Sequence, residues 1–241
     1  MVENLTKKAS DFSDKYIEIR TKEKRILTDL EVEKLPLVTD SIPNHKEWKI
    51  RKQTSDKIIN YLKSKKKSLY ILDLGCGNGW FSNVLSQIES SKVIGLDVNS
   101  VELEQAYRVF KKENLQFYYG DIFKITQFEK QFNIITLNAC VQYFPDFELL
   151  INKLKTCLAP KGEIHILDSP FYKNEAINNA KKRTYNYYKA LGYPEMANFY
   201  FHHSIDLISY FKIQYQPSQN WIVKIINRDD SPFMWVNYVH D

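Results

Sequence analysis

The sequence predicts an α/β fold in which helices cover both faces of a mostly parallel β-sheet. From residue 69 onward, short apolar runs alternate with segments of helical periodicity, a pattern typical of β-α-β units. The first of these runs leads directly into a glycine-rich loop and a helix. With 241 residues, 44% of them hydrophobic, the chain can bury one sizeable core, so we expect a single domain over residues 1–241.

The first part of the chain, residues 1–68, is predicted to be helical. Apolar side chains such as Tyr16 and Ile19 recur there at helical spacing. Pro36 and Pro43 interrupt the pattern, because proline ends or kinks a helix. We therefore expect separate helices ahead of the first strand.

Seven strands are expected after this segment. Six follow from the apolar runs, and the last follows from the alternation around Trp235. Their ranges are 69–74, 92–97, 115–119, 132–138, 162–168, 211–216 and 233–240. Residues 69–170 would thus form the core and residues 206–241 the C-terminal strands. Residues 171–205 are longer than a crossover requires and are predicted to form a helical cap between the fifth and sixth strands.

The loop after the first strand is the most specific feature of the sequence. Asp73 is followed by Gly75, Gly77 and Gly79 at alternate positions, and a helix begins directly afterwards. Glycine permits positive φ and a close approach of ligand to backbone, while the helix presents free N–H groups. The GxGxxG pattern of dinucleotide-binding folds would require glycine at position 80, which is Trp80. The spacing therefore argues against a nicotinamide cofactor.

The string LDLGCGNG resembles the first motif of the class I S-adenosylmethionine-dependent methyltransferases. This resemblance implies a Rossmann-like sheet of seven strands whose final strand runs antiparallel to the others. It also implies S-adenosylmethionine as the cofactor and S-adenosylhomocysteine as the product. Trp48, Arg51 and the GNGW sequence resemble a group of these enzymes that acts on small molecules, in which a helical N-terminal segment forms a lid.

Polar residues at strand ends are the candidate cofactor ligands. Asp97 lies about twenty residues beyond the loop, the separation at which an acid meets a ribose, and its alternative role is that of a helix N-cap or a turn residue. By resemblance, Asp73 orders the loop near the methionine amino group, and Asp121 and Ile122 bind adenine. Asp121 could also be a helix N-cap. Asn138 ends the fourth strand, where the cofactor and the acceptor should meet.

The acceptor side has weaker signals. Residues 138–141 read Asn-Ala-Cys-Val, which departs from the Asn/Asp-Pro-Pro-aromatic pattern of enzymes that methylate base amines. His202 and His203 are candidate general bases, with a capping or hydrogen-bonding role at the helix that begins near Ser204 as their alternative. Tyr143 is a third candidate catalytic residue. The catalytic group itself is not fixed by the sequence.

Three further residues are candidates for acceptor binding. Tyr16 and Arg20 share a helix face at i, i+4 in the predicted lid, and Tyr200 belongs to an aromatic-rich part of the predicted cap. Core packing is the alternative for Tyr16, and packing of the cap onto the sheet is the alternative for Tyr200.

Composition narrows the class of protein. A net charge of +5 is too small for a dedicated nucleic-acid binder. Three cysteines without CxxC spacing suggest a reducing cytoplasm, and no cluster with metal-ligand spacing occurs. The absence of a long apolar segment predicts neither a signal peptide nor a membrane span.

These observations predict a cytoplasmic, metal-independent methyltransferase that acts on a small molecule. The alternatives are an enzyme that methylates RNA or protein, and a methyltransferase-like protein that binds the nucleotide without turnover. The methyl acceptor and the oligomeric state stay open.

Overall fold

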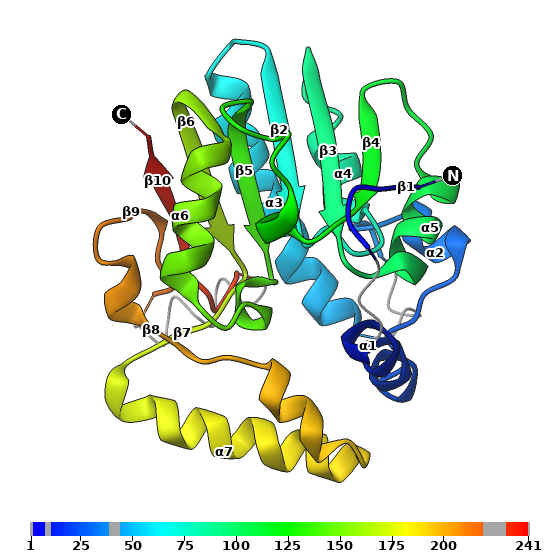
Figure 1. Ribbon diagram of the computed structural model, residues 1–241, viewed down its shortest axis with the longest axis vertical. Coiled ribbons are helices and arrows are strands. Elements are labelled where there is room, and N and C mark those ends of the chain that lie inside the picture. The colour runs from blue at the N-terminus through cyan, green and yellow to red at the C-terminus, as the bar shows by residue number, and fades with distance from the viewer. Residues whose placement is uncertain (1, 8–10, 39–43, 219–229, 241) are drawn as a thin grey trace.

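The computed structural model describes residues 2–7, 11–38, 44–218 and 230–240, whose strands form one large sheet and one small one (Figure 1). Within these residues the large sheet has eight strands in the order β1-β4-β3-β2-β5-β6-β10-β9. Their bounds are β1 Glu3–Asn4, β2 Leu69–Leu74, β3 Ser91–Asp97, β4 Leu115–Tyr119, β5 Phe132–Asn138, β6 Leu158–Leu167, β9 Lys212–Tyr215 and β10 Trp235–Val239. The predicted break at Pro43 lies outside the described residues.

The direction of the strands follows the prediction. β10 is antiparallel to both of its neighbours, β6 and β9, whereas the pairings among β1 to β6 in this sheet are parallel. The mostly parallel α/β fold with an antiparallel final strand is therefore confirmed. Strand β6 begins four residues earlier than the range predicted from Gly162. β2, β4 and β5 have the predicted bounds, and β3, β9 and β10 differ from them by one or two residues at an end.

The prediction of helices alone for residues 1–68 is wrong at the N-terminus. β1 pairs with the outer edge of β4, where Glu3 lies opposite Tyr118 and Asn4 opposite Tyr119. The backbone N–H of Leu5 donates to the carbonyl of Tyr119 at 2.8 Å. Glu3 and Asn4 are both polar and exposed, so they show no apolar–polar alternation that could predict a strand. Their pairing with β4 depends on backbone hydrogen bonds, which any residue other than proline can make.

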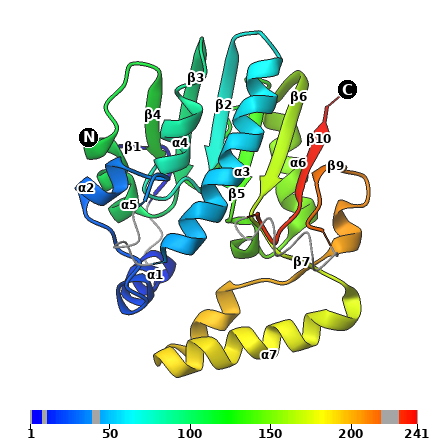
Figure 2. The same cartoon turned by 180° about the vertical axis from the view of Figure 1, so that it is seen from behind.

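Helices cover both faces of the sheet (Figures 1 and 2). α3 (His45–Ser64), α4 (Trp80–Leu85) and α5 (Ser100–Val109) lie on one face, and α6 (Phe147–Cys157) lies on the other. Alternate side chains of β2 enter different cores, since Ile71 packs in the cluster on the α3 side and Leu72 in the cluster on the α6 side. Both side chains are fully buried.

Two segments extend beyond the edge of the sheet at which the parallel strands end (Figure 1). One is α1 (Asp11–Lys22), which precedes the short α2 (Asp29–Glu33). The other is the inserted cap, formed by β7 (Phe171–Tyr172), α7 (Asn174–Leu191), the 3-10 helix η3 (Pro194–Phe199) and β8 (His203–Ser204). β7 and β8 pair with each other, so the cap leaves the core and returns to it at one point.

The cap packs on α1. Ile19 of α1, Tyr188 of α7 and Met196 of η3 form a small buried cluster that is separate from the two cores at the sheet. α1 and the cap therefore meet over the sheet edge that carries the site. Among the described residues, no helix is long and apolar enough to span a bilayer.

Candidate active site

A cavity of about 310 Å³ opens at the carboxyl ends of β2, β3, β4 and β5. Its walls come from the glycine loop, the ends of these strands, and the helices α1 and α3. Residues that line it include Tyr16, Arg20, Trp48, Arg51, Gly75, Gly77, Asp97, Glu102, Asp121, Ile122, Asn138, Tyr143 and Phe199. The structure thus brings together residues from the first and last thirds of the chain at the point where strand order reverses.

The three glycines of the loop have different surroundings. All have positive φ, at +74° for Gly75, +52° for Gly77 and +76° for Gly79. Gly75 and Gly77 line the cavity with bare backbone. Gly79 does not line it: a Cβ there would lie 2.6 Å from the Phe117 ring, so this glycine allows α4 to pack on β4.

Asp97 connects the end of β3 to the glycine loop. Its Oδ2 accepts the backbone N–H of Gly77 at 2.8 Å, and its Oδ1 accepts that of Asn99 at 2.8 Å. The N-cap of α5 is Asn99, so Asp97 does not cap this helix. Its bond to the N–H two residues further on is the turn role that was its other alternative. Burial raises the pKa of the Asp97 carboxyl above its usual value, and the side chain lines the cavity.

Asp73 lies behind the loop, where it does not line the cavity. Its Oδ2 accepts the Ser82 hydroxyl at 2.6 Å, and its Oδ1 accepts the Thr136 hydroxyl at 2.9 Å. These bonds join β2 to α4 and β5. Burial raises the pKa of this carboxyl to about 7.

Asp121 and Ile122 form the wall beyond β4. Asp121 is the N-cap of the 3-10 helix η1 (Ile122–Lys124), since its Oδ1 accepts the backbone N–H of Phe123 at 3.1 Å. Its Oδ2 lies 3.0 Å from Nζ of Lys124. The capping alternative is therefore present, while both residues also line the cavity. Ile122 offers a buried apolar surface there.

Asn138 ends β5 and lines the cavity. Its Oδ1 is buried and has no hydrogen-bond partner within the described part of the chain. A buried acceptor without a donor is costly, so this oxygen indicates where a ligand with N–H groups could bind.

The opposite wall is aromatic and contains one guanidinium. Tyr143, in the 3-10 helix η2 (Val141–Tyr143), meets the Tyr16 ring edge-on with centroids 5.8 Å apart. Arg20 lies 4.7 Å from the Tyr16 ring centre, and its Nη2 donates to the Tyr143 hydroxyl at 3.2 Å. Phe199 of the cap lines the same wall. Tyr16, Arg20 and Tyr143 are thus together, as candidates for the acceptor side.

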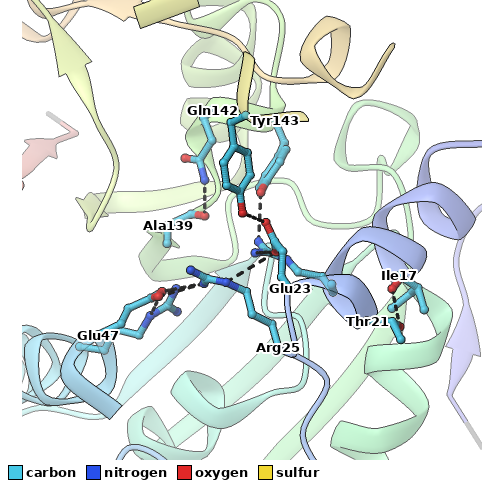
Figure 3. Close-up of polar contacts among 11 residues, drawn as sticks. Ile17, Thr21, Glu23, Arg25, Glu47, Ala139, Gln142 and Tyr143 are labelled. Atoms are coloured by element: carbon cyan, nitrogen blue, oxygen red, sulfur yellow. Dashed lines mark hydrogen bonds and ion pairs between the residues drawn. The ribbon is translucent and has the colours of Figure 1, made fainter. Parts of the chain in front are cut away.

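A chain of charged side chains connects α1 to α3 (Figure 3). Arg25 lies between two carboxylates, with its Nε 3.6 Å from Glu23 and its Nη1 2.9 Å from Glu47. Arg51 of α3 also binds Glu47, at 2.7 Å. Although burial opposes ionisation, Arg51 and Arg25 hold the pKa of the Glu47 carboxyl below its usual value.

Trp80, which departs from the dinucleotide pattern, has a packing role. Its ring lies edge-on to the ring of Trp48 in α3, with centroids 5.4 Å apart. The Arg51 guanidinium lies over the Trp48 ring, with Cζ 5.1 Å from the ring centre. The predicted lid residues Trp48 and Arg51 therefore contact the helix that follows the glycine loop.

His202, His203 and Tyr200 do not line the cavity. Nε2 of His203 donates to the Val141 carbonyl at 3.2 Å, which makes His203 a support for η2. His202 lies next to the Tyr200 ring and hydrogen-bonds Thr184 at 2.9 Å. The cap of the 3-10 helix η4 (Ile205–Ile208) is Ser204, so neither histidine caps this helix, and both have the hydrogen-bonding role that was the other part of their alternative.

Glu102 is a cavity residue that the sequence analysis missed. It lies in the first turn of α5, where a carboxylate is already explained by the helix dipole, so no sequence signal singled it out. Asn99 Nδ2 donates to its Oε2 at 3.3 Å. Burial, and then the nearby Asp97 carboxylate, raises the pKa of Glu102 to about 7. Among the described residues, no group of three His, Cys, Asp or Glu is arranged to hold a metal ion.

Comparisons with known proteins agree on one family. A family model described as a methyltransferase domain matches residues 65–221. Malonyl-[acyl-carrier protein] O-methyltransferase 1 of Ilyobacter polytropus is 32% identical over 117 residues, which are 48% of this chain and 43% of that protein. Demethylmenaquinone methyltransferase of Lactobacillus johnsonii is 29% identical over 114 residues, 45% of this chain and 47% of that protein. The chain thus spans less than half the length of either relative.

A solved structure is similar over nearly the whole chain. Magnesium protoporphyrin IX methyltransferase of Synechocystis, with bound S-adenosylhomocysteine, has a TM-score of 0.58 and covers 95% of this chain and 96% of its own. At 15% sequence identity, this likeness concerns the fold.

Proposed function

We propose that this chain, which belongs to the class I S-adenosylmethionine-dependent methyltransferases, transfers the sulfonium methyl group of its cofactor to a small molecule. One observation carries the proposal. A single cavity has the glycine loop and strand-end carboxylates on one wall and the aromatic side chains of α1, η2 and η3 on the other. The first wall suits a nucleoside and the second suits an organic acceptor.

The residues present fit S-adenosylmethionine. Gly75 and Gly77 line the cavity with backbone, against which the cofactor could lie. At Gly75 the missing Cβ makes room for Cys140, whose Cβ would be 2.7 Å away. Asp97 would accept ribose hydroxyls, because each of its oxygens retains a free lone pair after accepting one N–H. Asn138 Oδ1 would accept a hydrogen bond from the ammonium group of the cofactor, and Ile122 would pack on its adenine ring. When bound, the cofactor supplies the electrophilic methyl group.

Methyl transfer is an in-line displacement in which the acceptor lone pair forms the new bond to carbon as the bond to sulfur breaks. The protein contributes by alignment, which can lower a barrier by several kcal/mol. Tyr143 is positioned for this purpose, since Arg20 holds its hydroxyl and His203 supports its helix. We assign Tyr143 and Tyr16 to acceptor contact and His203 to positioning.

The roof over the cavity favours a small acceptor. α1 and the cap meet above it through Ile19 and Tyr188, and Phe199 reaches the cavity wall. The two relatives described above are named for different acceptors, demethylmenaquinone and malonyl-acyl carrier protein. We also propose a reducing compartment such as the cytoplasm, because Cys76, Cys140 and Cys157 are buried free thiols.

Isothermal titration calorimetry with S-adenosylmethionine and S-adenosylhomocysteine tests the proposal, with NAD as the control ligand. We expect both sulfur compounds to bind and NAD to give no heat. A panel of quinols, carboxylic acids and amines would then be scored for S-adenosylhomocysteine release. Failure of both sulfur compounds to bind would contradict the proposed cofactor, and binding without turnover of any acceptor would favour a protein that only binds the nucleotide.

A further inference from the structure

We propose that Glu102 is a second ribose-binding carboxylate, which accepts one hydroxyl of the cofactor ribose while Asp97 accepts the other. This inference rests on the proposed function, since it assumes that S-adenosylmethionine occupies the cavity. It adds a specificity-determining residue to the cofactor site.

Both carboxylates lie close to one glycine, Gly77. The backbone N–H of Gly77 donates to Asp97 at 2.8 Å. A Cβ built on Gly77 would lie 3.4 Å from Oε2 and 3.7 Å from Oε1 of Glu102, so this carboxylate is in contact range of the same residue. Both acids line the cavity together with Gly77. A nucleoside that lies against the bare backbone of Gly77 therefore meets both carboxylates.

Asp97 and Glu102 have unused acceptor capacity for the two hydroxyls of a diol. Each Asp97 oxygen already accepts one backbone N–H, from Gly77 or Asn99. Glu102 receives one neutral donor, the Asn99 amide, on Oε2. Within the described ranges it has no ion pair, because Arg20 binds Glu23 and Arg51 binds Glu47. Two adjacent hydroxyls, one donating to each acid, would satisfy both acceptors.

This arrangement has a consequence for ligand choice. A pair of carboxylates around a cis-diol repels a phosphate on either hydroxyl, so a ribose that carries a phosphate should be rejected. It should also penalise loss of one particular hydroxyl, the one that Glu102 accepts.

Calorimetry with three probes tests the inference: S-adenosylhomocysteine and its 2′-deoxy and 3′-deoxy analogues. We expect Glu102→Gln to weaken S-adenosylhomocysteine binding about tenfold, the effect of one charge-assisted hydrogen bond. One deoxy analogue should bind the wild type and Glu102→Gln equally, because the hydroxyl that Glu102 would accept is already missing. Glu104→Gln is the matched control, since Glu104 is an exposed glutamate on the same helix.

Each outcome separates this inference from the proposed function. Equal binding of S-adenosylhomocysteine by the wild type and Glu102→Gln would overturn the role of Glu102 alone. The same would follow if both analogues lost as much affinity on substitution as the parent compound does, since that pattern indicates a structural effect. Absence of binding to the wild type would overturn the proposed function, and this inference with it. Thermal unfolding of both variants checks that they are folded.

Discussion

At the scale of single residues, the strand-end acids divide into two kinds of role. Asp97 both holds the glycine loop and faces the cavity, whereas Asp73 binds Ser82 and Thr136 behind the loop. Both were expected to serve the cofactor, because a sequence shows that an acid ends a strand but not which way its side chain points. The roles of both in cofactor binding stay predictions.

Substitution of these two acids should separate binding from stability. Asp97→Asn should weaken the binding of S-adenosylhomocysteine by about 1.5–3 kcal/mol, because a charged hydrogen-bond acceptor is lost. Asp73→Asn should leave affinity nearly unchanged but lower the free energy of unfolding by about 1–2 kcal/mol, since one buried hydroxyl loses its acceptor. Calorimetry and urea unfolding measure the two quantities. A large loss of affinity in folded Asp73→Asn would show that Asp73 contributes to the cofactor site after all.

Affinity should also depend on pH through Glu102. Its pKa of about 7 reflects burial and the charge of Asp97, partly offset by Arg20 and Arg51 across the cavity, and Tyr16 also faces it. The ionised carboxylate accepts a ribose hydroxyl more strongly than the protonated carboxyl does, so ligand binding lowers this pKa. Affinity for S-adenosylhomocysteine should be highest above pH 7 and should fall, by at most about tenfold per pH unit, as the pH drops toward 6. The slope should disappear in Glu102→Gln, and an unchanged slope would assign the effect to another group.

At the scale of elements, α1 is held between the core and the cap. Arg20 binds Tyr143 of the core, and Glu23, directly after α1, accepts the hydroxyl of Tyr187 from α7. Apart from these polar contacts, Ile19 of α1 packs against Tyr188 of α7. The cap is therefore held both through α1 and directly by the core, where the Phe201 N–H donates to the Gln142 carbonyl at 2.7 Å.

Removal of one hydroxyl should loosen this contact. Tyr187→Phe loses the bond to Glu23 and should raise the amide exchange rates of the C-terminal half of α7 about two- to tenfold, the effect of roughly 0.5–1.5 kcal/mol. Tyr185→Phe is the control, because Tyr185 lies on the same helix and is 46% exposed. Hydrogen-exchange mass spectrometry measures both variants. Equal exchange in the two would mean that the bond to Glu23 does not hold the cap.

At the scale of the whole molecule, the sequence predicted the parts whose pattern is local. The core strands were identifiable because apolar runs such as residues 69–74 end at turns and glycines, and the excess length of residues 171–205 indicated a cap. What packs against this cap was not predictable, since the contact of Tyr188 with Ile19 joins segments far apart in the chain. β1 and the cavity position of Glu102 were missed for the same reason: both depend on tertiary placement.

A buried polar network also joins distant parts of the chain. Glu163 of β6 accepts the Tyr61 hydroxyl of α3 at 2.9 Å, binds the Lys65 ammonium, and lies 3.0 Å from Nε2 of His165. The indole N–H of Trp235 in β10 donates to His165 Nδ1 at 3.1 Å. Because indole is only a donor, Nε2 must carry the imidazole proton and donate it to Glu163.

This network should make the fold sensitive to acid. Burial would raise the pKa of Glu163, but hydrogen bonds from His165 and Lys65 hold it at about 2, below its ordinary value of 4.5. The stability that Glu163 contributes is therefore complete above pH 4.5 and is lost as the pH falls toward 2. Burial lowers the pKa of His165, so its protonation below its ordinary value of 6.5 opposes folding as well.

Glu163→Gln should remove the first of these effects. We expect the variant to be about 2 kcal/mol less stable than the wild type at pH 7 and to lose less stability between pH 5 and pH 3, because the depressed pKa is gone. Urea unfolding at a series of pH values measures this, with Glu148→Gln, an exposed glutamate of α6, as the control. Parallel pH curves for Glu163→Gln and the wild type would mean that acid acts through other groups. Convergence of the two curves at low pH would identify Glu163 as the acid-sensitive contact between β6 and the α3 segment that carries Tyr61 and Lys65.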